Sequence, residues 1–391
     1  MPYGAGTEVV SVGVNSNEGS PGIRGTLRGR IGIASGLDVV IISDSEILIQ
    51  HGTGSRPAEL IRDTDLTGVL GRLMHALETG DADLQELLSL FTGEDRAEAE
   101  DLIDQLVASR ILADSSRSAV QQYLGFSMGA ESSLESARVS VIGAGPVGAR
   151  IADTLVRHGI GELRILDERP TDAIWHAYVA PAHRGEKPVG EPAHQVLCDQ
   201  LSGGATQVTA LSGGFAPGAI ADAVREVDLV VMAIEHVHPR LAHLVNRACL
   251  RVGTPWLLAQ VDGAVGAAGP LFYPPHTACY NDFEVLARSI STNAAMDRLF
   301  HRHLQIRGTA SFFPGLPSYV DIVAGYVGLA AVEYLLTGSS WALERVTTID
   351  FDSMVIDTQD LLRLPRCPVC GGGSAPLHPP FPASPPPGGA W

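Results

Sequence analysis

The spacing of apolar residues changes once along the first third of the chain, from short continuous runs to helical spacing. Two β-branched runs, Val39–Ile42 and Ile47–Ile49, flank a polar segment and predict a β-hairpin, and Glu59–Arg62 predicts a third strand. Apolar residues then recur every three or four positions, which predicts three helices. These positions are Leu66, Val69, Leu70, Leu73 and Leu77, then Leu84, Leu87 and Leu88, then Leu102, Ile103, Leu106, Val107 and Ile111. Three short strands followed by three helices predict a small α+β winged-helix module over residues 29–125.

A second pattern begins with the apolar run Val139–Ile142, which enters a Gly-x-Gly-x-x-Gly turn followed by apolar positions at helical spacing. The glycines of the turn are Gly143, Gly145 and Gly148. A further apolar run, Leu163–Leu166, ends on Asp167. Such glycines permit a tight turn and the close approach of a phosphate, and the acid is placed for ribose hydroxyls. The pattern predicts an α/β Rossmann-type domain over 137–373, whose ligand is ATP, a dinucleotide or neither.

Three more apolar segments complete the predicted elements. Asp228–Ile234 and Trp256–Val261 predict two further strands of the Rossmann-type domain. Tyr319–Leu336 is the longest apolar run, but it carries Asp321 and Glu333. It therefore predicts a buried helix rather than a membrane span.

Composition indicates where the folded modules begin and end. Residues 1–28 are rich in Gly, Ser and Asn and are expected to be loosely ordered. The Ser- and Ala-rich stretch 114–136 is expected to contain a linker, placed at 126–136. Residues 374–391 are dominated by Pro, Gly, Ala and Ser, which bury too little apolar surface to fold, so a disordered tail is expected.

The charge balance excludes one class of partner. The chain has 391 residues and a formal net charge of −17. Phosphate binding needs clustered Lys and Arg, so nucleic acid is not an expected partner.

The N-terminal residues show no basic stretch followed by an apolar run, so no signal peptide is predicted. The 5 cysteines have no even framework and fit a reducing compartment. We therefore expect a cytoplasmic protein with no membrane partner.

The predicted winged helix is too acidic for its usual partner, DNA. Asp81–Asp104 contains nine Asp and Glu residues and one base, Arg96, so the helix that would enter a major groove repels phosphates. Two interpretations stay open: a structural domain with a solvated acidic face, and a module that binds an extended peptide along the sheet edge. The surface expected for the peptide comprises Glu59, Leu60, Ile61, Arg62, Asp101, Asp104 and Gln105.

Two further sets of residues carry candidate chemistry. Glu235 follows a predicted parallel strand, at the end where open α/β sheets bind ligands. It either holds the magnesium of a nucleotide or is an exposed loop acid. Cys279, Cys367 and Cys370 supply three of the four thiolates of a two-knuckle zinc site, and Asp282 stands where the fourth belongs. Zinc on these four residues and a knuckle without metal both stay open.

The glycine turn and two later segments resemble one family. The turn with His158–Asp167 resembles the ubiquitin-activating-enzyme-like superfamily of ThiF and MoeB, in which the Asp holds the ribose of ATP. Glu235–Arg240 is similar to that family's Asp-Asn-x-x-x-Arg segment. Cys279, with Cys367 and Cys370, resembles its zinc knuckles. The resemblance implies ATP as the ligand of the turn and zinc as the metal.

The acidic module and the segment Gly269–Tyr280 narrow the resemblance. Together they are similar to ThiF-like leader-peptide-binding proteins found beside YcaO cyclodehydratases in azole-containing ribosomal peptide pathways. In that family the winged helix binds the leader of the precursor peptide. The YcaO partner uses ATP to convert Cys, Ser and Thr into thiazolines and oxazolines. The resemblance covers residues 36–373 and implies a precursor leader peptide and a YcaO enzyme as partners.

Departures from the family pattern bear on catalysis. Active adenylating members carry Ser-Asn-Leu-x-Arg-Gln after the ribose Asp, whereas Ile174–Val179 holds neither Asn nor Arg, and Glu235 replaces the expected Asp. Lys187 is the candidate match to a family lysine. Because a triphosphate must be neutralised for attack, these departures predict a scaffold without catalytic residues. The alternatives are an ATP-dependent adenylating enzyme and, from Asp167, an NAD-dependent oxidoreductase. A homodimer is one option for the oligomeric state.

Overall fold

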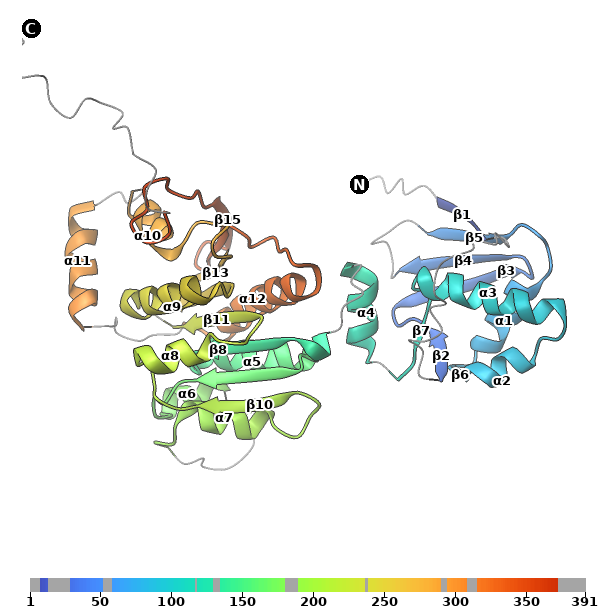
Figure 1. The fold of residues 1–391 in the computed structure, drawn as a ribbon, viewed down its shortest axis with the longest axis horizontal. Coiled ribbons are helices and arrows are strands. Elements are labelled where there is room, and N and C mark those ends of the chain that lie inside the picture. The colour runs from blue at the N-terminus through green and yellow to red at the C-terminus, as the bar shows by residue number, and fades with distance from the viewer. Residues whose placement is uncertain are drawn as a thin grey trace, which may run out of the picture. The chain divides into compact units, whose positions relative to one another are not determined.

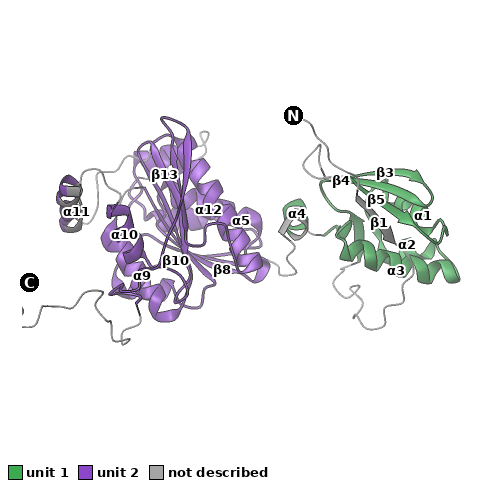
Figure 2. Cartoon of the chain, turned by 90° about the horizontal axis from the view of Figure 1, so that it is seen from above, with its two compact units in different colours: residues 1–133 green, residues 134–391 purple. Residues whose placement is uncertain are grey.

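The chain folds into two compact units, residues 1–133 and 134–391 (Figure 2). The structure is a computed structural model. It describes residues 8–12, 29–51, 58–116, 118–128, 134–179, 189–235, 238–289, 294–307 and 315–371.

Unit 1, residues 1–133, contains two small sheets and four described helices (Figure 1). Its strands are β1 (Glu8–Val12), β2 (Arg30–Ile33), β3 (Leu37–Ser43), β4 (Glu46–His51), β5 (Glu59–Asp63), β6 (Ala82–Asp83) and β7 (Leu112–Asp114). Its helices are α1 (Val69–Leu77), α2 (Leu84–Ser89), α3 (Glu94–Ala108) and α4 (Ala119–Met128). The first sheet has the order β1-β5-β4-β3, with β1 parallel to β5 and the other pairs antiparallel. The second sheet is antiparallel, in the order β6-β2-β7.

A single cluster of apolar side chains forms the described core of unit 1. Ile47 and Ile49 are alternate residues of β4, and Leu70, Leu73 and Met74 share one face of α1. None of these five side chains is more than 1% exposed. The helix α1 packs against β3 and β4, and α3 packs against α1. Removing this apolar surface from water is the main stabilising contribution.

The predicted hairpin, third strand and three helices of unit 1 are present as β3, β4, β5 and α1 to α3. Three features were not predicted. The strand β1 lies within residues 1–28, expected to be loosely ordered, and α4 lies within 114–136, expected to contain a linker. The sheet of β2, β6 and β7 was missed because its strands hold two to four residues, too few for alternation to show. The winged-helix arrangement stays a prediction.

Unit 2, residues 134–391, is built on one large sheet (Figure 1). Its strands are β8 (Arg138–Ile142), β9 (Glu162–Leu166), β10 (Gln207–Leu211), β11 (Leu229–Ile234), β12 (Trp256–Asp262), β13 (Val265–Phe272), β14 (Arg345–Asp350) and β15 (Val355–Asp360). They have the order β10-β9-β8-β11-β12-β13-β14-β15. The strands from β10 to β12 are parallel, and β13, β14 and β15 continue the sheet antiparallel. The chain order reverses between β8 and β11, which is the switch point of a doubly wound sheet.

Helices cover both faces of this sheet (Figure 2). They are α5 (Pro146–His158), α6 (Ala173–Val179), α7 (Ala193–Leu201), α8 (Pro217–Ala223), α9 (Pro239–Val252), α10 (Tyr280–Ser289), α11 (Ala294–Arg307) and α12 (Pro317–Thr337), with a 3₁₀ turn at Leu134–Ser136. On one face α5 packs against α12, and α12 against β12 and β13. On the other, α8 and α9 share a core with Val230, Met232 and Trp256. The α/β Rossmann-type fold predicted from the glycine turn is confirmed.

One described helix, α12, is long and apolar enough to cross a bilayer by length and composition. It packs against α5, β12 and β13, and its Val320, Val323 and Val327 are at most 1% exposed. The buried helix predicted for Tyr319–Leu336 is therefore present. The strands β13 to β15 were not predicted, and the expected tail 374–391 lies outside the described residues.

Candidate functional site

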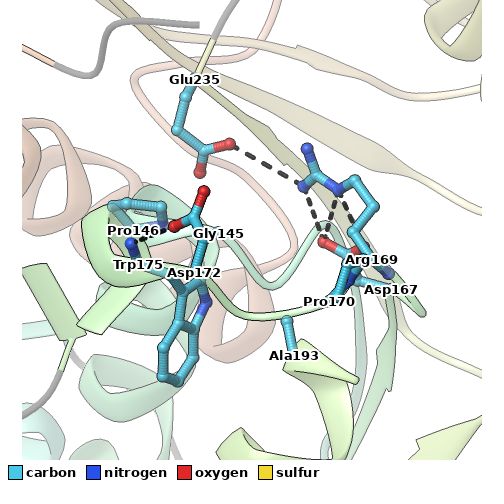
Figure 3. Close-up of a pocket in the computed structure, with 9 residues that line it drawn as sticks. All are labelled: Gly145, Pro146, Asp167, Arg169, Pro170, Asp172, Trp175, Ala193 and Glu235. Atoms are coloured by element: carbon cyan, nitrogen blue, oxygen red, sulfur yellow. Dashed lines mark hydrogen bonds and ion pairs between the residues drawn. The ribbon is translucent and has the colours of Figure 1, made fainter. Parts of the chain in front are cut away.

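A cavity of about 210 Å³ lies at the switch point of the unit 2 sheet (Figure 3). Gly145 follows β8, Asp167 follows β9 and Glu235 follows β11, so three neighbouring strands present these residues at their carboxyl ends. The other lining residues are Pro146, Arg169, Pro170, Asp172, Trp175 and Ala193. Ligands of open α/β sheets bind at this position. The cavity is therefore the candidate ligand site of unit 2.

The three turn glycines are required for different reasons. Gly143 has φ +109°, and a Cβ there would overlap the carbonyl oxygen of Ala233. A Cβ at Gly148 would overlap the carbonyl oxygen of Gly143. At Gly145 the neighbour is a side chain: a Cβ would lie 2.5 Å from the carboxyl carbon of Glu235. The space above Gly145, which a dinucleotide fold leaves for phosphate, is filled by a carboxyl group of the protein itself.

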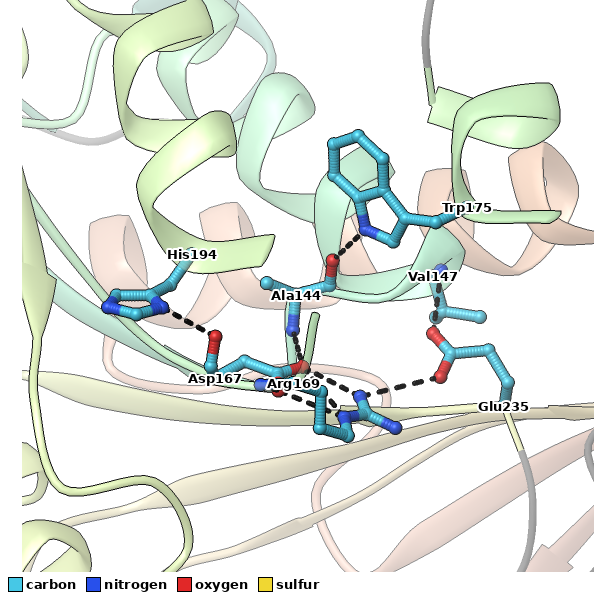
Figure 4. Close-up of polar contacts among 7 residues, drawn as sticks. All are labelled: Ala144, Val147, Asp167, Arg169, Trp175, His194 and Glu235. Carbon is cyan, nitrogen blue, oxygen red and sulfur yellow. Dashed lines mark hydrogen bonds and ion pairs between the residues drawn. The ribbon is translucent and has the colours of Figure 1, made fainter. Parts of the chain in front are cut away.

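Asp167 is fully buried and its carboxylate is already bonded (Figure 4). Its Oδ2 accepts the Ala144 N–H at 2.7 Å, and its two oxygens accept Arg169 Nε at 2.9 and 3.1 Å. Arg169 Nη2 also donates to Oδ2 at 2.6 Å. Burial lowers the pKa of Arg169, but the hydrogen bond and charge of Asp167 outweigh it, and the pKa is raised above its ordinary value. The guanidinium therefore covers the acid that would bind a ribose.

Glu235 is also buried, at 1% exposure. Its Oε1 accepts the Val147 N–H at 3.1 Å at the N-terminus of α5, and its Oε2 lies 3.9 Å from Arg169 Nη2. Burial raises the pKa of this carboxyl to about 7, against the favourable charge of Arg169. A helix N-terminus favours an anion, and here a carboxyl group of the chain itself occupies that position. Glu235 is therefore not the exposed loop acid that the sequence left open as one interpretation.

Two residues of this cavity were missed from the sequence. Arg169 joins Asp167 to Glu235, and its guanidinium carbon lies 5.4 Å from the centroid of the Phe215 ring. Trp175 of α6 donates its Nε1–H to the Ala144 carbonyl at 2.6 Å. The sequence did hold one indication of the role of Arg169, since it lies two positions after Asp167 at the end of a strand. Lys187 lies outside the described residues.

A second polar cluster joins the start of α10 to the segment after β15. The potential ligand atoms of Cys279, Asp282, Cys367 and Cys370 all lie within 4.8 Å of one another. The sulfurs of Cys279 and Cys367 are 3.7 Å apart, and the Cys370 sulfur is 3.1 Å from Asp282 Oδ2. The structure thus brings together the four residues proposed from the sequence, although they lie in segments 88 positions apart.

The donor set of this cluster fits a metal ion. Two thiolates about 2.3 Å from a tetrahedral zinc are separated by about 3.8 Å, close to the separation of Cys279 and Cys367. Asp282 is 0% exposed, and its Oδ1 has no hydrogen-bond partner among the described residues. A buried carboxylate oxygen without a donor is costly unless a cation satisfies it. Three sulfurs and a carboxylate could therefore hold zinc.

The residues expected to bind a peptide in unit 1 are not equally accessible. Glu59 and Leu60 are half-buried, and Arg62 is exposed and forms an ion pair with Glu46 at 2.7 Å. Ile61 is 2% exposed and belongs to the core, so its side chain contributes packing. On α3, Asp101 is exposed, and Asp104 and Gln105 are half-buried. The edge of β5 expected to receive a peptide pairs with β1.

Comparison with known proteins identifies unit 2. Residues 120–369 match the ThiF family. Ubiquitin-like modifier-activating enzyme 5 of Mus musculus is 23% identical over 256 residues, 61% of this chain and 57% of that protein. The sulfur carrier protein ThiS adenylyltransferase of Bacillus subtilis is 29% identical over 139 residues, 34% of this chain and 40% of that protein. The chain thus spans less than two thirds of the curated relatives it matches.

Solved structures extend the likeness beyond unit 2. Escherichia coli MccB with MccA has a TM-score of 0.57 and 17% identity, over 88% of this chain and 100% of that one. The heterocyclase TruD has a TM-score of 0.57 and 16% identity, over 88% of this chain and 43% of that one. Because 88% of the chain is more than unit 2 holds, the shared fold includes part of unit 1. Since the family match covers more than half of its residues, this chain belongs to the ThiF family.

Proposed function

We propose that this protein binds the leader of a ribosomal precursor peptide through unit 1 and presents the peptide to a YcaO-type ATP-dependent cyclodehydratase. The partner enzyme forms the thiazolines and oxazolines, and this chain performs no chemistry on ATP. Holding the leader keeps the rest of the precursor close to the partner's active site. This raises the effective concentration of the substrate without new catalytic groups.

The peptide-binding part of the proposal is supported by the two structural neighbours. MccB is described as a microcin C7 biosynthetic enzyme and was solved with N-formylated MccA, and TruD is described as a heterocyclase. Their likeness to this chain includes part of unit 1. Asp101 on α3 is exposed and gives the surface of unit 1 a negative charge, which favours a leader with basic residues.

The non-catalytic part rests on one observation: the chain's own groups occupy both polar positions of the cavity. Arg169 is bonded to both oxygens of Asp167, and the Glu235 carboxyl lies over Gly145 at the N-terminus of α5. A nucleotide would have to displace the Arg169 guanidinium from the ribose position and the Glu235 carboxyl from the phosphate position. Both displacements break charge-assisted hydrogen bonds in a buried site.

Leader binding is tested by fluorescence polarisation with the full chain and a labelled leader peptide. We expect micromolar or tighter affinity. Leu60→Glu should weaken binding at least about tenfold by altering β5. Val40→Glu is the matched control, because Val40 lies in the same row of the same sheet, on β3, and is 56% exposed. Binding that neither substitution changes would place the leader outside this sheet.

A second candidate function, ATP-dependent adenylation of a peptide, is favoured by the neighbours solved with ATP and with AMPCPP. Peptide-dependent exchange of pyrophosphate into ATP separates the two candidates, because adenylation alone produces it. Our proposal requires no exchange above a control without enzyme. No specific observation favours the NAD-dependent oxidoreductase, since Asp167 is bonded to Arg169.

The cysteine cluster has a structural role in this proposal. Zinc held by Cys279, Asp282, Cys367 and Cys370 would join the start of α10 to the segment after β15. Arg363 already links the same regions, donating to the carbonyls of Pro275 and Cys370 at 2.8 Å each. A metal ion there would stabilise unit 2 without entering the cavity chemistry.

A further inference from the structure

The outer edge of β5 is covered by a distant part of the same chain. The strand β1 pairs with β5 in parallel over all five of its residues, from Glu8 opposite Glu59 to Val12 opposite Asp63. The other edge of β5 pairs with β4. Every strand edge available on β5 is therefore taken within this chain, and β1 is the outermost strand of the sheet on that side.

β5 is a well-fixed template for strand pairing. At its end, the Asp63 carboxylate accepts the backbone N–H groups of Asp65, Leu66, Thr67 and Gly68 at 3.0–3.2 Å, which fixes the turn into α1. On its inner side, β5 is held by its ladder with β4 and by the buried side chain of Ile61. Strand addition to a fixed edge costs less ordering entropy than addition to a mobile one.

We propose that residues Glu8–Val12 are an intramolecular occupant of the peptide-binding edge, which a leader strand must displace to bind β5. This inference rests on the proposed leader binding. The edge binds an extended peptide, because strand addition pairs backbone N–H and C=O groups. The chain's own segment satisfies those groups until a precursor arrives, and this protects an edge that would otherwise pair with unrelated chains.

Displacement is feasible because β1 is short and its pairing is parallel. Parallel ladders are slightly less stable per residue than antiparallel ones, so a leader that runs antiparallel to β5 gains on each pair. The tethered segment competes at an effective concentration on the order of millimolar. If β1 is paired in about nine molecules of ten, the leader affinity falls about tenfold.

Two full-chain variants separate pairing from other effects. Alternate residues of a parallel strand bond to the same neighbour, so Val9→Pro with Val10→Pro removes at least one donor whichever residue faces β5. Val9→Thr with Val10→Thr keeps both N–H groups and a high strand preference, and serves as the matched control. Circular dichroism and thermal unfolding verify that both variants stay folded.

Hydrogen exchange of β5 tests the occupancy without any ligand. The residues of β5 whose N–H groups face β1 should exchange about tenfold faster in the proline variant than in wild type and the threonine variant, since their edge is then open. Equal exchange in all three proteins overturns the inference. It leaves the proposed function untouched.

Fluorescence polarisation with the labelled leader then tests the competition. The proline variant should bind about tenfold more tightly than wild type, and the threonine variant like wild type. Faster exchange with unchanged affinity means that β1 covers β5 but the leader binds elsewhere, which overturns the competition. Absence of binding in all three proteins overturns the proposed function and the competition together, while the exchange result still decides whether β1 covers β5.

Discussion

Two clusters of buried acidic and polar groups in the described part of unit 2 differ in how these groups are satisfied. In the cavity at the switch point, Asp167 and Glu235 accept hydrogen bonds from backbone N–H groups, Arg169 donates hydrogen bonds to Asp167, and it forms an ion pair with Glu235 at 3.9 Å. In the cysteine cluster, Asp282 Oδ1 finds no partner among the described residues, and the sulfurs of three cysteines lie near this carboxylate. The first cluster is complete without a ligand, whereas the second has the features of a site that needs a cation.

This difference teaches that a sequence motif and the groups that surround it in the fold are separate properties. The glycine turn keeps the shape that suits a nucleotide, yet Glu235 and Arg169 supply the charges that a nucleotide would bring or neutralise. The cysteine cluster lacks one thiolate of the family pattern, yet its geometry suits a metal. Fold and motif are inherited together, and function depends on the particular side chains.

The largest expected effect is on the cysteine cluster. Cys367→Ser with Cys370→Ser should remove about one equivalent of zinc and lower the free energy of unfolding by more than about 4 kcal/mol. Metal analysis and thermal unfolding measure the two effects. Cys198→Ser, which changes a buried thiol of α7 outside the cluster, is the control and should retain the metal. Wild-type protein that is stably folded and free of metal would contradict this assignment.

The next effect concerns Glu235 and pH. Burial raises the pKa of this carboxyl from 4.5 in the unfolded chain to about 7 in the folded protein. The folded protein therefore binds this proton more tightly than the unfolded chain does. The resulting stabilisation of the fold is fully present below about pH 4.5 and is lost as the pH rises through 7. Relative to wild type, Glu235→Gln should gain about 2.5 kcal/mol of unfolding free energy between pH 5 and 8. Urea unfolding at each pH measures it, with Glu86→Gln on the exposed surface of α2 as control. Parallel profiles for wild type and Glu235→Gln would show that this carboxyl is not buried as described.

A smaller effect tests whether Glu235 fills the phosphate position. Gly145→Ala should destabilise the protein by about 2 kcal/mol, because its Cβ meets the Glu235 carboxyl, and by less than about 1 kcal/mol in a Glu235→Ala background. Gly218→Ala on α8 is the control, since a Cβ there meets no atom within 4 Å. Equal, small effects of Gly145→Ala and Gly218→Ala would mean that the space above Gly145 is open.

Most of the features predicted correctly are encoded in short, continuous stretches of the sequence. A strand, three glycines and an acid lie within about thirty residues, so the Rossmann-type unit was evident before its tertiary structure was known. The cluster at Cys279 was predictable because ligand spacing follows metal geometry. The hairpin of β3 and β4 followed from two β-branched runs on either side of a short polar segment.

Roles created by long-range contacts were not predictable from one sequence. Arg169 is important because it reaches Asp167 and Glu235 together, and nothing in its neighbours fixes that orientation. Ile61 was expected at a binding surface, but the position of the sheet over α1 places it in the core. The pairing of β1 with β5 joins segments 51 positions apart in their register, and five residues give little local signal.

The central claim is that this chain captures a peptide and leaves ATP chemistry to its partner. The most direct measurement is heterocycle formation on the precursor by the reconstituted YcaO enzyme, followed by mass spectrometry. With Asp167→Asn or Glu235→Gln, each verified to fold and to bind leader, the rate should stay within a few-fold of wild type. Leu60→Glu should lower it by at least about tenfold, because substrate capture is lost. A loss of activity in Asp167→Asn, with leader binding intact, would contradict the account and establish nucleotide chemistry in the cavity of unit 2.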